Sequence, residues 1–159
     1  MQSFVKKFEE TIKVCSETPA INDYKDAPIT YGEFARRIEM MHILWKEAGL
    51  QPGDKISLNS RSCTNWALTF MAATTGGYVA CQLFHGFTPS GTQKLVNHSE
   101  SRILYTEKGF FSSMNFDEMP ELLAVVDMKN MEVLASRGKF AELNERREEL
   151  FATKSPSGF

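Results

Sequence analysis

Residues 53–106 constrain the fold more than any other stretch, because strand-like and helix-like patterns alternate within this short length of sequence. Short apolar runs that predict strands lie at residues 55–59, 78–83 and 102–106. Helical patterns at residues 65–75 and 88–98 separate them. Strands joined by crossover helices form parallel sheets. The sequence therefore predicts an α/β domain, a three-layer, doubly wound and mostly parallel sheet with helices on both faces.

The remaining segments extend this domain at both ends. We expect a single α/β domain over residues 1–159, in which residues 1–29 form an N-terminal helix and short extended pieces. Residues 30–127 form the βα repeat core, which includes a further strand at residues 122–127. Residues 128–159 are expected to form a C-terminal helix and a tail.

The helix expected to follow Thr30 has the most clearly marked ends. Thr30 and Glu33 make a capping-box pair, in which each side chain can bind the other's backbone N–H. Gly49 supplies the left-handed residue that ends the helix. The apolar residues that fall on one face are Phe34, Ile38, Met41, Trp45 and Ala48.

Composition and charge exclude several classes of protein. A formal net charge of -2 without a basic stripe gives no reason to expect a nucleic-acid partner. No apolar run approaches the ~18–20 residues that a transmembrane helix needs. The 3 cysteines show no metal-ligand spacing, so we expect reduced thiols, no metal site and a cytoplasmic location.

Phe84, His85 and Phe87 are the candidate substrate-binding residues. They follow the strand predicted at residues 78–83, and open α/β sheets bind ligands outside the carboxyl ends of their strands. No nucleophile or carboxylate partner stands at a supporting spacing, so a cleft-lining or structural role for His85 is favoured over a catalytic one. Cys63 precedes a predicted helix, a place that can lower the pKa of a thiol, but it too lacks a base. No catalytic residue is predicted.

Five short segments carry a more specific pattern when they are taken together and in order. They are ITYGEF at 29–34, AGLQPGDKI at 48–56, NWALTFMA at 65–72, GGYVACQL at 76–83 and NHSESRIL at 97–104. In this combination they resemble the N-terminal part of the AMP-forming acyl-CoA synthetases, and the bacterial long-chain fatty acid–CoA ligases most. The resemblance covers about residues 28–127. Gln82 departs from it, since the family has proline there, and Cys81 replaces a small aliphatic residue.

Members of that family activate a carboxylic acid with ATP to an acyl-AMP and pass the acyl group to coenzyme A. Three family features are absent from these 159 residues: the Ser/Thr/Gly-rich phosphate loop ending in Gly-x-Pro-Lys-Gly, the later acidic ribose-binding motif and the C-terminal lysine. The resemblance therefore implies the front scaffold of a longer ligase, which is inactive and binds no cofactor by itself. The whole enzyme is expected to use ATP, Mg²⁺, coenzyme A and a fatty acid.

The expected partner of this chain is the remainder of the same enzyme, or a second copy that covers an exposed apolar patch as a homodimer. Two alternatives stay open at this point. The chain could be a stand-alone, non-catalytic binding module that keeps the same fold. It could also be an unrelated flavodoxin-like domain that binds a nucleotide at a topological switch point.

Overall fold

A computed structural model describes residues 3–153, and its centre is a 5-stranded sheet in the order β4-β3-β5-β6-β7. The strands are β3 (Lys55–Asn59), β4 (Val79–Gln82), β5 (Ile103–Thr106), β6 (Ala124–Asp127) and β7 (Val133–Ser136). The first four run parallel to their neighbours, whereas β7 pairs antiparallel with β6. The predicted α/β fold with a mostly parallel sheet is thus confirmed.

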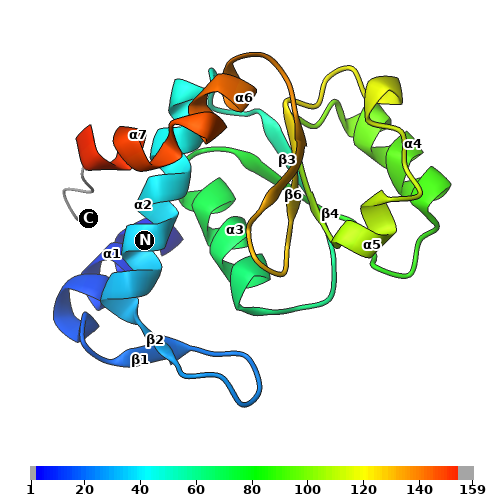
Figure 1. Ribbon diagram of the computed structural model, residues 1–159. Helices are drawn as coiled ribbons and strands as arrows, with labels where there is room; N and C mark the ends of the chain where they lie inside the picture. The colour runs from blue at the N-terminus through cyan, green and yellow to red at the C-terminus, as the bar shows by residue number, and fades with distance from the viewer. Residues whose placement is uncertain (1–2, 154–159) are drawn as a thin grey trace.

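The chain reverses direction across the sheet at β3. From β3 it adds β4 on one side, then crosses over to place β5 on the other, so that Ile56 of β3 pairs with both Ala80 and Ile103. This order is the doubly wound one, and its topological switch point lies between β3 and β5. The loops that leave the carboxyl ends of these two strands diverge to opposite faces of the sheet (Figure 1).

Helices cover both faces of the sheet, as predicted (Figure 1). The helices on one side are α1 (Phe4–Cys15), α2 (Tyr31–Glu47), α3 (Thr64–Thr75), α6 (Gly138–Glu145) and α7 (Arg147–Thr153). Those on the other side are α4 (Pro89–Ser99), α5 (Lys108–Phe111) and the 3₁₀ helix η1 (Phe116–Glu118). A small antiparallel pair, β1 (Pro19–Ile21) and β2 (Ile29–Thr30), precedes α2. No helix among residues 3–153 is both long and apolar enough to cross a membrane.

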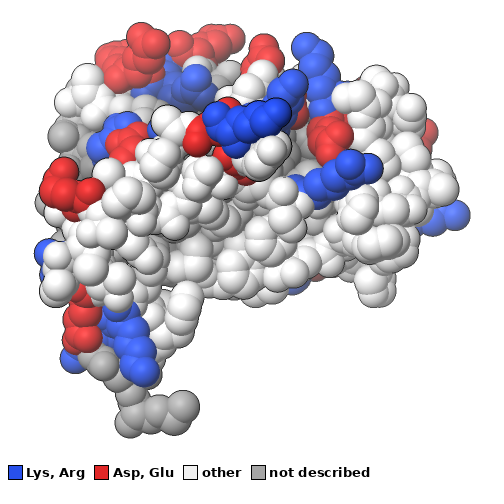
Figure 2. Space-filling model, turned by 90° about the horizontal axis from the view of Figure 1, so that it is seen from below, with Lys and Arg blue, Asp and Glu red and all other residues white. Residues whose placement is uncertain are grey.

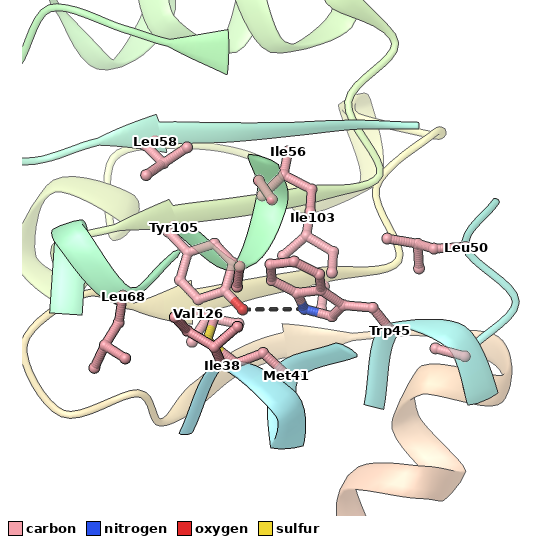
Figure 3. Packing of buried hydrophobic residues seen from close by; sticks show 14 of the residues in the cluster. Ile38, Met41, Trp45, Leu50, Ile56, Leu58, Leu68, Ile103, Tyr105 and Val126 are labelled. Carbon is pink, nitrogen blue, oxygen red and sulfur yellow. Dashed lines mark hydrogen bonds between the residues drawn. The ribbon is translucent and has the colours of Figure 1, made fainter. Parts of the chain in front are cut away.

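The larger core lies between α2, α3 and the sheet. The predicted apolar stripe of α2 is buried along its whole length, and Ile38 and Trp45 are completely inaccessible. The Trp45 indole Nε1–H donates a hydrogen bond to the Tyr105 hydroxyl over 3.2 Å, so a polar contact ties α2 to the middle of the sheet (Figure 3). Helical periodicity alone located this face correctly.

The start of α2 differs from the predicted capping box in one bond. The Thr30 hydroxyl accepts from the Glu33 backbone N–H over 3.2 Å, as predicted. The Glu33 carboxylate instead accepts from the guanidinium groups of Arg36 and Arg37, both at 2.7 Å. Hydrogen bonding from Arg36, with help from Arg37, lowers the pKa of Glu33 to about 2. The reciprocal half of the capping box was therefore wrong, because two arginines within one turn compete better for the carboxylate.

Two of the predicted elements, although apolar in sequence, are partly open to solvent. α3 buries Leu68, Ala72 and Ala73, but Trp66 and Phe70 stack on each other at its outer side and stay half-buried. β4 is an edge strand rather than a covered one, and Val79 is 45% exposed. Apolar composition predicted both elements but could not show which neighbours cover them.

The C-terminal part is also more divided than expected. Residues 128–138, for which no strand was predicted, contain β7, which folds back on β6 as an antiparallel hairpin. The single C-terminal helix expected within residues 128–159 is two helices, α6 and α7, separated at Arg146. The predicted tail at residues 154–159 lies outside the described residues.

Candidate functional site

A cavity of about 410 Å³ lies at the carboxyl edge of the sheet, where the loops after β3, β5 and β6 meet. Open α/β sheets bind ligands at this place. We call it the switch-point cavity. The side chains of opposite charge that line it are Asp23, Arg61, Glu107, Lys108, Asp127 and Lys129.

Two of the carboxylates in the switch-point cavity are occupied by backbone partners. Asp23 Oδ1 accepts from the Thr64 N–H over 2.8 Å and so caps the first turn of α3 from the β1–β2 loop. Asp127 is only 5% exposed, and its Oδ1 accepts from the Lys129 N–H over 3.1 Å. These two acids hold the loops in place, because each satisfies a backbone donor at the edge of the sheet.

The basic side chains of the cavity are available to a ligand. Arg61, Lys108 and Lys129 are exposed, and none is recorded in an ion pair with any of residues 3–153. Unpaired cations at the rim of a cavity favour an anionic group such as a phosphate or carboxylate. Figure 2 views the molecule from this side: uncharged side chains cover the middle of the face, and basic and acidic ones mix along its upper margin.

A buried polar network, which the sequence did not reveal, supports this edge. The Asn59 side-chain amide donates to the Phe84 carbonyl over 3.2 Å and to the Thr92 hydroxyl over 3.4 Å. Thr106 donates to Asn59 Oδ1 over 3.4 Å, and all three polar residues are at most 2% exposed. The network joins the ends of β3 and β5 to α4 and to the loop after β4. An asparagine that closes an apolar strand at its carboxyl end is the signal by which the sequence could have been searched for it.

The structure places Phe84, His85 and Phe87 in the exposed loop after β4. Phe84 lies against both of the others, with ring centroids 4.9 Å from His85 and 5.7 Å from Phe87. Phe84 and His85 line a second cavity of about 300 Å³, which shares Ser60 and Ser62 with the switch-point cavity. Phe87 does not line it. The three residues are thus brought together beside the switch point, and their part in substrate binding stays a prediction.

Cys63 does not have the character of an activated thiol. It is the N-cap of α3, and its Sγ accepts from the Trp66 N–H over 3.4 Å. Burial raises its pKa, which is opposite to the lowered pKa that its position before a helix allows. The position before the helix does not lower the pKa of this thiol, because partial burial outweighs the effect of the helix end. A structural capping role accounts for this residue.

The described residues do not form a complete nucleotide site. Phosphates bind where several backbone N–H groups converge, yet the first-turn donors of α3 are taken by Asp23 and Cys63. At α4 the Gly91 N–H is taken by Thr88. Among residues 3–153, no group of three or more His, Cys, Asp or Glu side chains is placed to hold a metal ion. The starts of α3 and α4 thus do not offer a set of free, converging N–H groups to a triphosphate.

Comparison with known proteins decides the family. The family described as AMP-binding enzyme matches residues 8–156, nearly the whole chain. The chain belongs to the AMP-binding enzyme family. This membership overturns the alternative of an unrelated flavodoxin-like domain, although the strand order on its own is compatible with either.

Relatives of this family member include two acetyl-coenzyme A synthetases. It is 30% identical over 84 residues to that of Pyrobaculum aerophilum, covering 52% of this chain and 12% of the relative. It is 25% identical over 122 residues to that of Chlorobaculum tepidum, covering 74% of this chain and 18% of the relative. The chain therefore spans less than a fifth of the length of either relative.

The fold is shared with solved ligases. The crystal structure of coronafacic acid ligase from Pectobacterium brasiliense superposes with a TM-score of 0.72 at 19% identity, over 81% of this chain and 26% of that one. At this identity the likeness concerns the fold alone. It bears out the three-layer arrangement predicted from the sequence.

Proposed function

We propose that this chain is the N-terminal part of a ligase that activates a carboxylic acid with ATP to an acyl-AMP and transfers the acyl group to coenzyme A. The observation that carries the proposal is the family match over residues 8–156, with acetyl-coenzyme A synthetases among the relatives. For the acid itself we propose a long-chain fatty acid, on the strength of the sequence segments that resemble the fatty acid–CoA ligases.

Within such an enzyme this chain acts as scaffold and as one wall of the site. Arg61, Lys108 and Lys129 are available to hold an anionic group of ATP or coenzyme A at the switch-point cavity. Phe84 and His85 form the neighbouring wall. No step of the reaction is assigned to these residues alone, because they lack the converging backbone donors that a triphosphate needs.

The remainder of the same enzyme is the proposed partner, and the cytoplasm the proposed location. Four large apolar side chains on β4, α4 and the loop between them are exposed: Val79, Phe84, Phe87 and Leu95. Apolar surface of this kind marks an interaction site. When the chain is isolated, a second copy can cover it instead, which gives a homodimer.

An adenylation assay on the whole protein tests this function. Pyrophosphate release would be measured with acetate, octanoate and hexadecanoate, and we expect hexadecanoate to be preferred. Preference for acetate would exclude the fatty acid and keep the ligase, whereas no release with any acid would exclude the ligase.

The same assay tests the basic side chains of the switch-point cavity. Arg61→Gln removes a charged donor, so we expect kcat/KM to fall about tenfold or more. The matched control is Lys46→Gln, which removes an exposed charge on α2 and should leave kcat/KM unchanged. Equal effects of the two substitutions would contradict a role for this cavity.

A further inference from the structure

The outer side of β4 is an open edge of the sheet. In the order β4-β3-β5-β6-β7 this strand comes first, so only its inner side has a partner strand among residues 3–153. The Val79 N–H points inward and donates to the Asp54 carbonyl over 2.9 Å. Further along the strand, the Leu83 N–H donates to the Leu58 carbonyl, also over 2.9 Å. The unpaired side of such a strand is a template for pairing with another chain.

Ala80 and Gln82 carry the free backbone groups of this edge. Along a strand, successive residues direct their N–H and C=O groups to opposite sides. Because Val79 and Leu83 bond toward β3, the two residues at even positions between them turn their N–H and C=O groups outward. Each of these two residues therefore offers one donor and one acceptor to a further strand.

The edge lacks the features that keep exposed strands apart. Charged side chains, lysine above all, and proline commonly protect such edges. No Asp, Glu, Lys or Arg stands between Arg61 and Lys94, a stretch that contains the whole of α3 and β4. Gln82 stands where the sequences that this chain resembles have proline, so the edge keeps an N–H that proline would remove. Neither charge nor proline therefore opposes a second strand here, and Val79, 45% exposed, adds apolar surface.

β4 can pair antiparallel with the same strand of a second copy. When Cys81 lies on the twofold axis, Ala80 comes opposite Gln82 of the second copy, and the reverse. These pairs are of the hydrogen-bonded kind, because their N–H and C=O groups point across the edge toward each other. The register thus forms about four backbone hydrogen bonds, and it uses every free group that the strand presents outward.

The neighbouring twofold registers use fewer free groups. With the axis at Ala80, Gln82 comes opposite Tyr78, whose N–H already donates within its own chain over 2.9 Å. With the axis at Gln82, Ala80 comes opposite Phe84, whose carbonyl already accepts from an N–H of its own loop over 3.1 Å. The register centred on Cys81 is therefore favoured.

The side chains on one face of β4 also match in this register. Val79, Cys81 and Leu83 are alternate residues and project from the same face, and Leu83 packs against the apolar cluster around Val96. Val79 comes opposite Leu83 of the second copy, and apolar cross-strand pairs of this kind stabilise a sheet. The free thiols of the two copies of Cys81 face each other, with their Cα atoms about 4.5 Å apart, close enough for a disulfide.

We propose that two copies of this chain associate through β4, paired antiparallel across a twofold axis at Cys81, so that their sheets join into one. The proposal makes the homodimer named above specific in its interface and its register. It does not rest on the ligase function, because association is measured without ATP, a carboxylic acid or coenzyme A.

Oxidative cross-linking tests the pairing directly. The variant Cys15→Ser/Cys63→Ser keeps Cys81 as its only cysteine. Diamide forms a disulfide by taking up the two thiol hydrogens, so we expect this variant to give a covalent dimer on a non-reducing gel. The matched control, Cys81→Ser, keeps the other two cysteines and should remain a single chain. No dimer from the first variant, or equal amounts from both, would overturn the proposal.

A mixed cross-link tests the register. In chains whose own cysteines are all replaced by serine, Val79→Cys should not link to itself, and neither should Leu83→Cys, because each lies far from its own copy across the axis. A mixture of the two chains should link, since these positions face each other. Self-linking of either chain, with none between them, would contradict the register.

Two substitutions of Gln82 separate the backbone from the side chain. Gln82→Pro removes the outward N–H of each copy, so the dimer dissociation constant from sedimentation velocity should rise about tenfold or more. Gln82→Ala keeps the N–H and should leave the constant unchanged. Circular dichroism of both variants checks that the fold is kept, which we expect because this N–H does not bond to β3.

Three outcomes of the sedimentation experiment would refute self-pairing: equal weakening by the two substitutions of Gln82, no weakening by Gln82→Pro, or an unsubstituted chain that stays monomeric at every concentration. Each would leave the β4 edge to another segment of the enzyme.

Discussion

The two faces of the sheet are built from the same strands, but different kinds of side chain cover them. On the α2 face, apolar and aromatic side chains pack around Ile38, Trp45 and Ile56 and bury them fully. On the α4 face, a smaller apolar cluster around Val96 and Leu104 lies beside buried hydroxyls and an amide.

The difference between the faces continues to the surface. Beside α4, Phe84 is 61% and Phe87 43% exposed, whereas the corresponding stripe of α2 is buried. A face that is already closed supplies stability, and a face that leaves aromatic side chains in water is available to a partner. The buried stripe of α2 is therefore expected to carry much of the stability of the chain, and the exposed aromatic side chains beside α4 to offer a surface to a partner.

The largest effect is expected at the centre of the α2 face. Trp45→Ala removes a fully buried indole that makes edge contacts with Tyr78 and Tyr105, so the free energy of unfolding should fall by ~3–5 kcal/mol. Urea denaturation followed by circular dichroism measures it. Val14→Ala, at a position 84% exposed on α1, is the control and should change stability by less than ~0.5 kcal/mol. Trp45→Phe gives a smaller loss if the alanine variant does not fold.

The α4 face should depend on polar pairing instead. Ser57 and Ser101 are fully buried, 2.7 Å apart, and Ser101 also lies 2.8 Å from Ser99. Ser101→Ala leaves the Ser57 hydroxyl without its partner and should cost ~1–3 kcal/mol. The double variant Ser57→Ala/Ser101→Ala should recover part of that loss in the same denaturation experiment. If the stability losses of the two single variants simply add in the double variant, the two hydroxyls are not coupled. The contrast between the faces is then weaker.

A histidine makes the α2 face sensitive to pH. His42 Nε2 lies 2.7 Å from the Ala72 carbonyl, between α2 and α3. Burial lowers its pKa, against the opposing effects of that carbonyl and of Glu39. The unfolded chain therefore binds a proton before the folded one does, so stability should be constant above about pH 6.5 and fall as the pH drops below it.

Unfolding titrations between pH 5 and pH 8 measure this effect. His42→Gln should flatten the fall, whereas His85→Gln, in the exposed loop of the α4 side, should leave it intact. A profile that is unchanged in His42→Gln would show that another group is responsible.

The smallest effect on stability is expected where the apolar surface is open. The double variant Phe84→Ser/Phe87→Ser exposes nothing new, so the isolated chain should lose less than ~1 kcal/mol. Its self-association, measured by sedimentation velocity over a range of concentrations, should decrease. A large loss of stability without any change in association would show that Phe84 and Phe87 serve the stability of the fold and not an interaction.

Much of the fold was predictable because its signals are local. The stripe of α2, its Thr30 cap and the positive φ of Gly49, 94°, follow from neighbouring residues. The edge position of β4 and the β7 hairpin were not predictable in this way, since both depend on which strands become neighbours. The break between α6 and α7 falls at Arg146. No proline or glycine stands there to mark it in the sequence.

The candidate site was less predictable for the same reason. Phe84 and His85 lie after β4 as expected, at the carboxyl edge of the sheet, and their part in substrate binding stays a prediction. The partnership of Asp23 with Thr64 joins residues 41 positions apart, and that of Asn65 with Met128 joins residues 63 apart. Contacts at such separation leave no pattern in a single sequence, so the switch-point cavity that they shape emerged only in three dimensions.

Pyrophosphate release by the isolated 159-residue chain tests the central claim most directly. The chain would be mixed with ATP, Mg²⁺, hexadecanoate and coenzyme A, with the whole protein assayed alongside. If this part is scaffold and cavity wall, the whole protein releases pyrophosphate and the isolated chain releases none above background. Robust release by the isolated chain would contradict the account, because its residues would then contain the complete site.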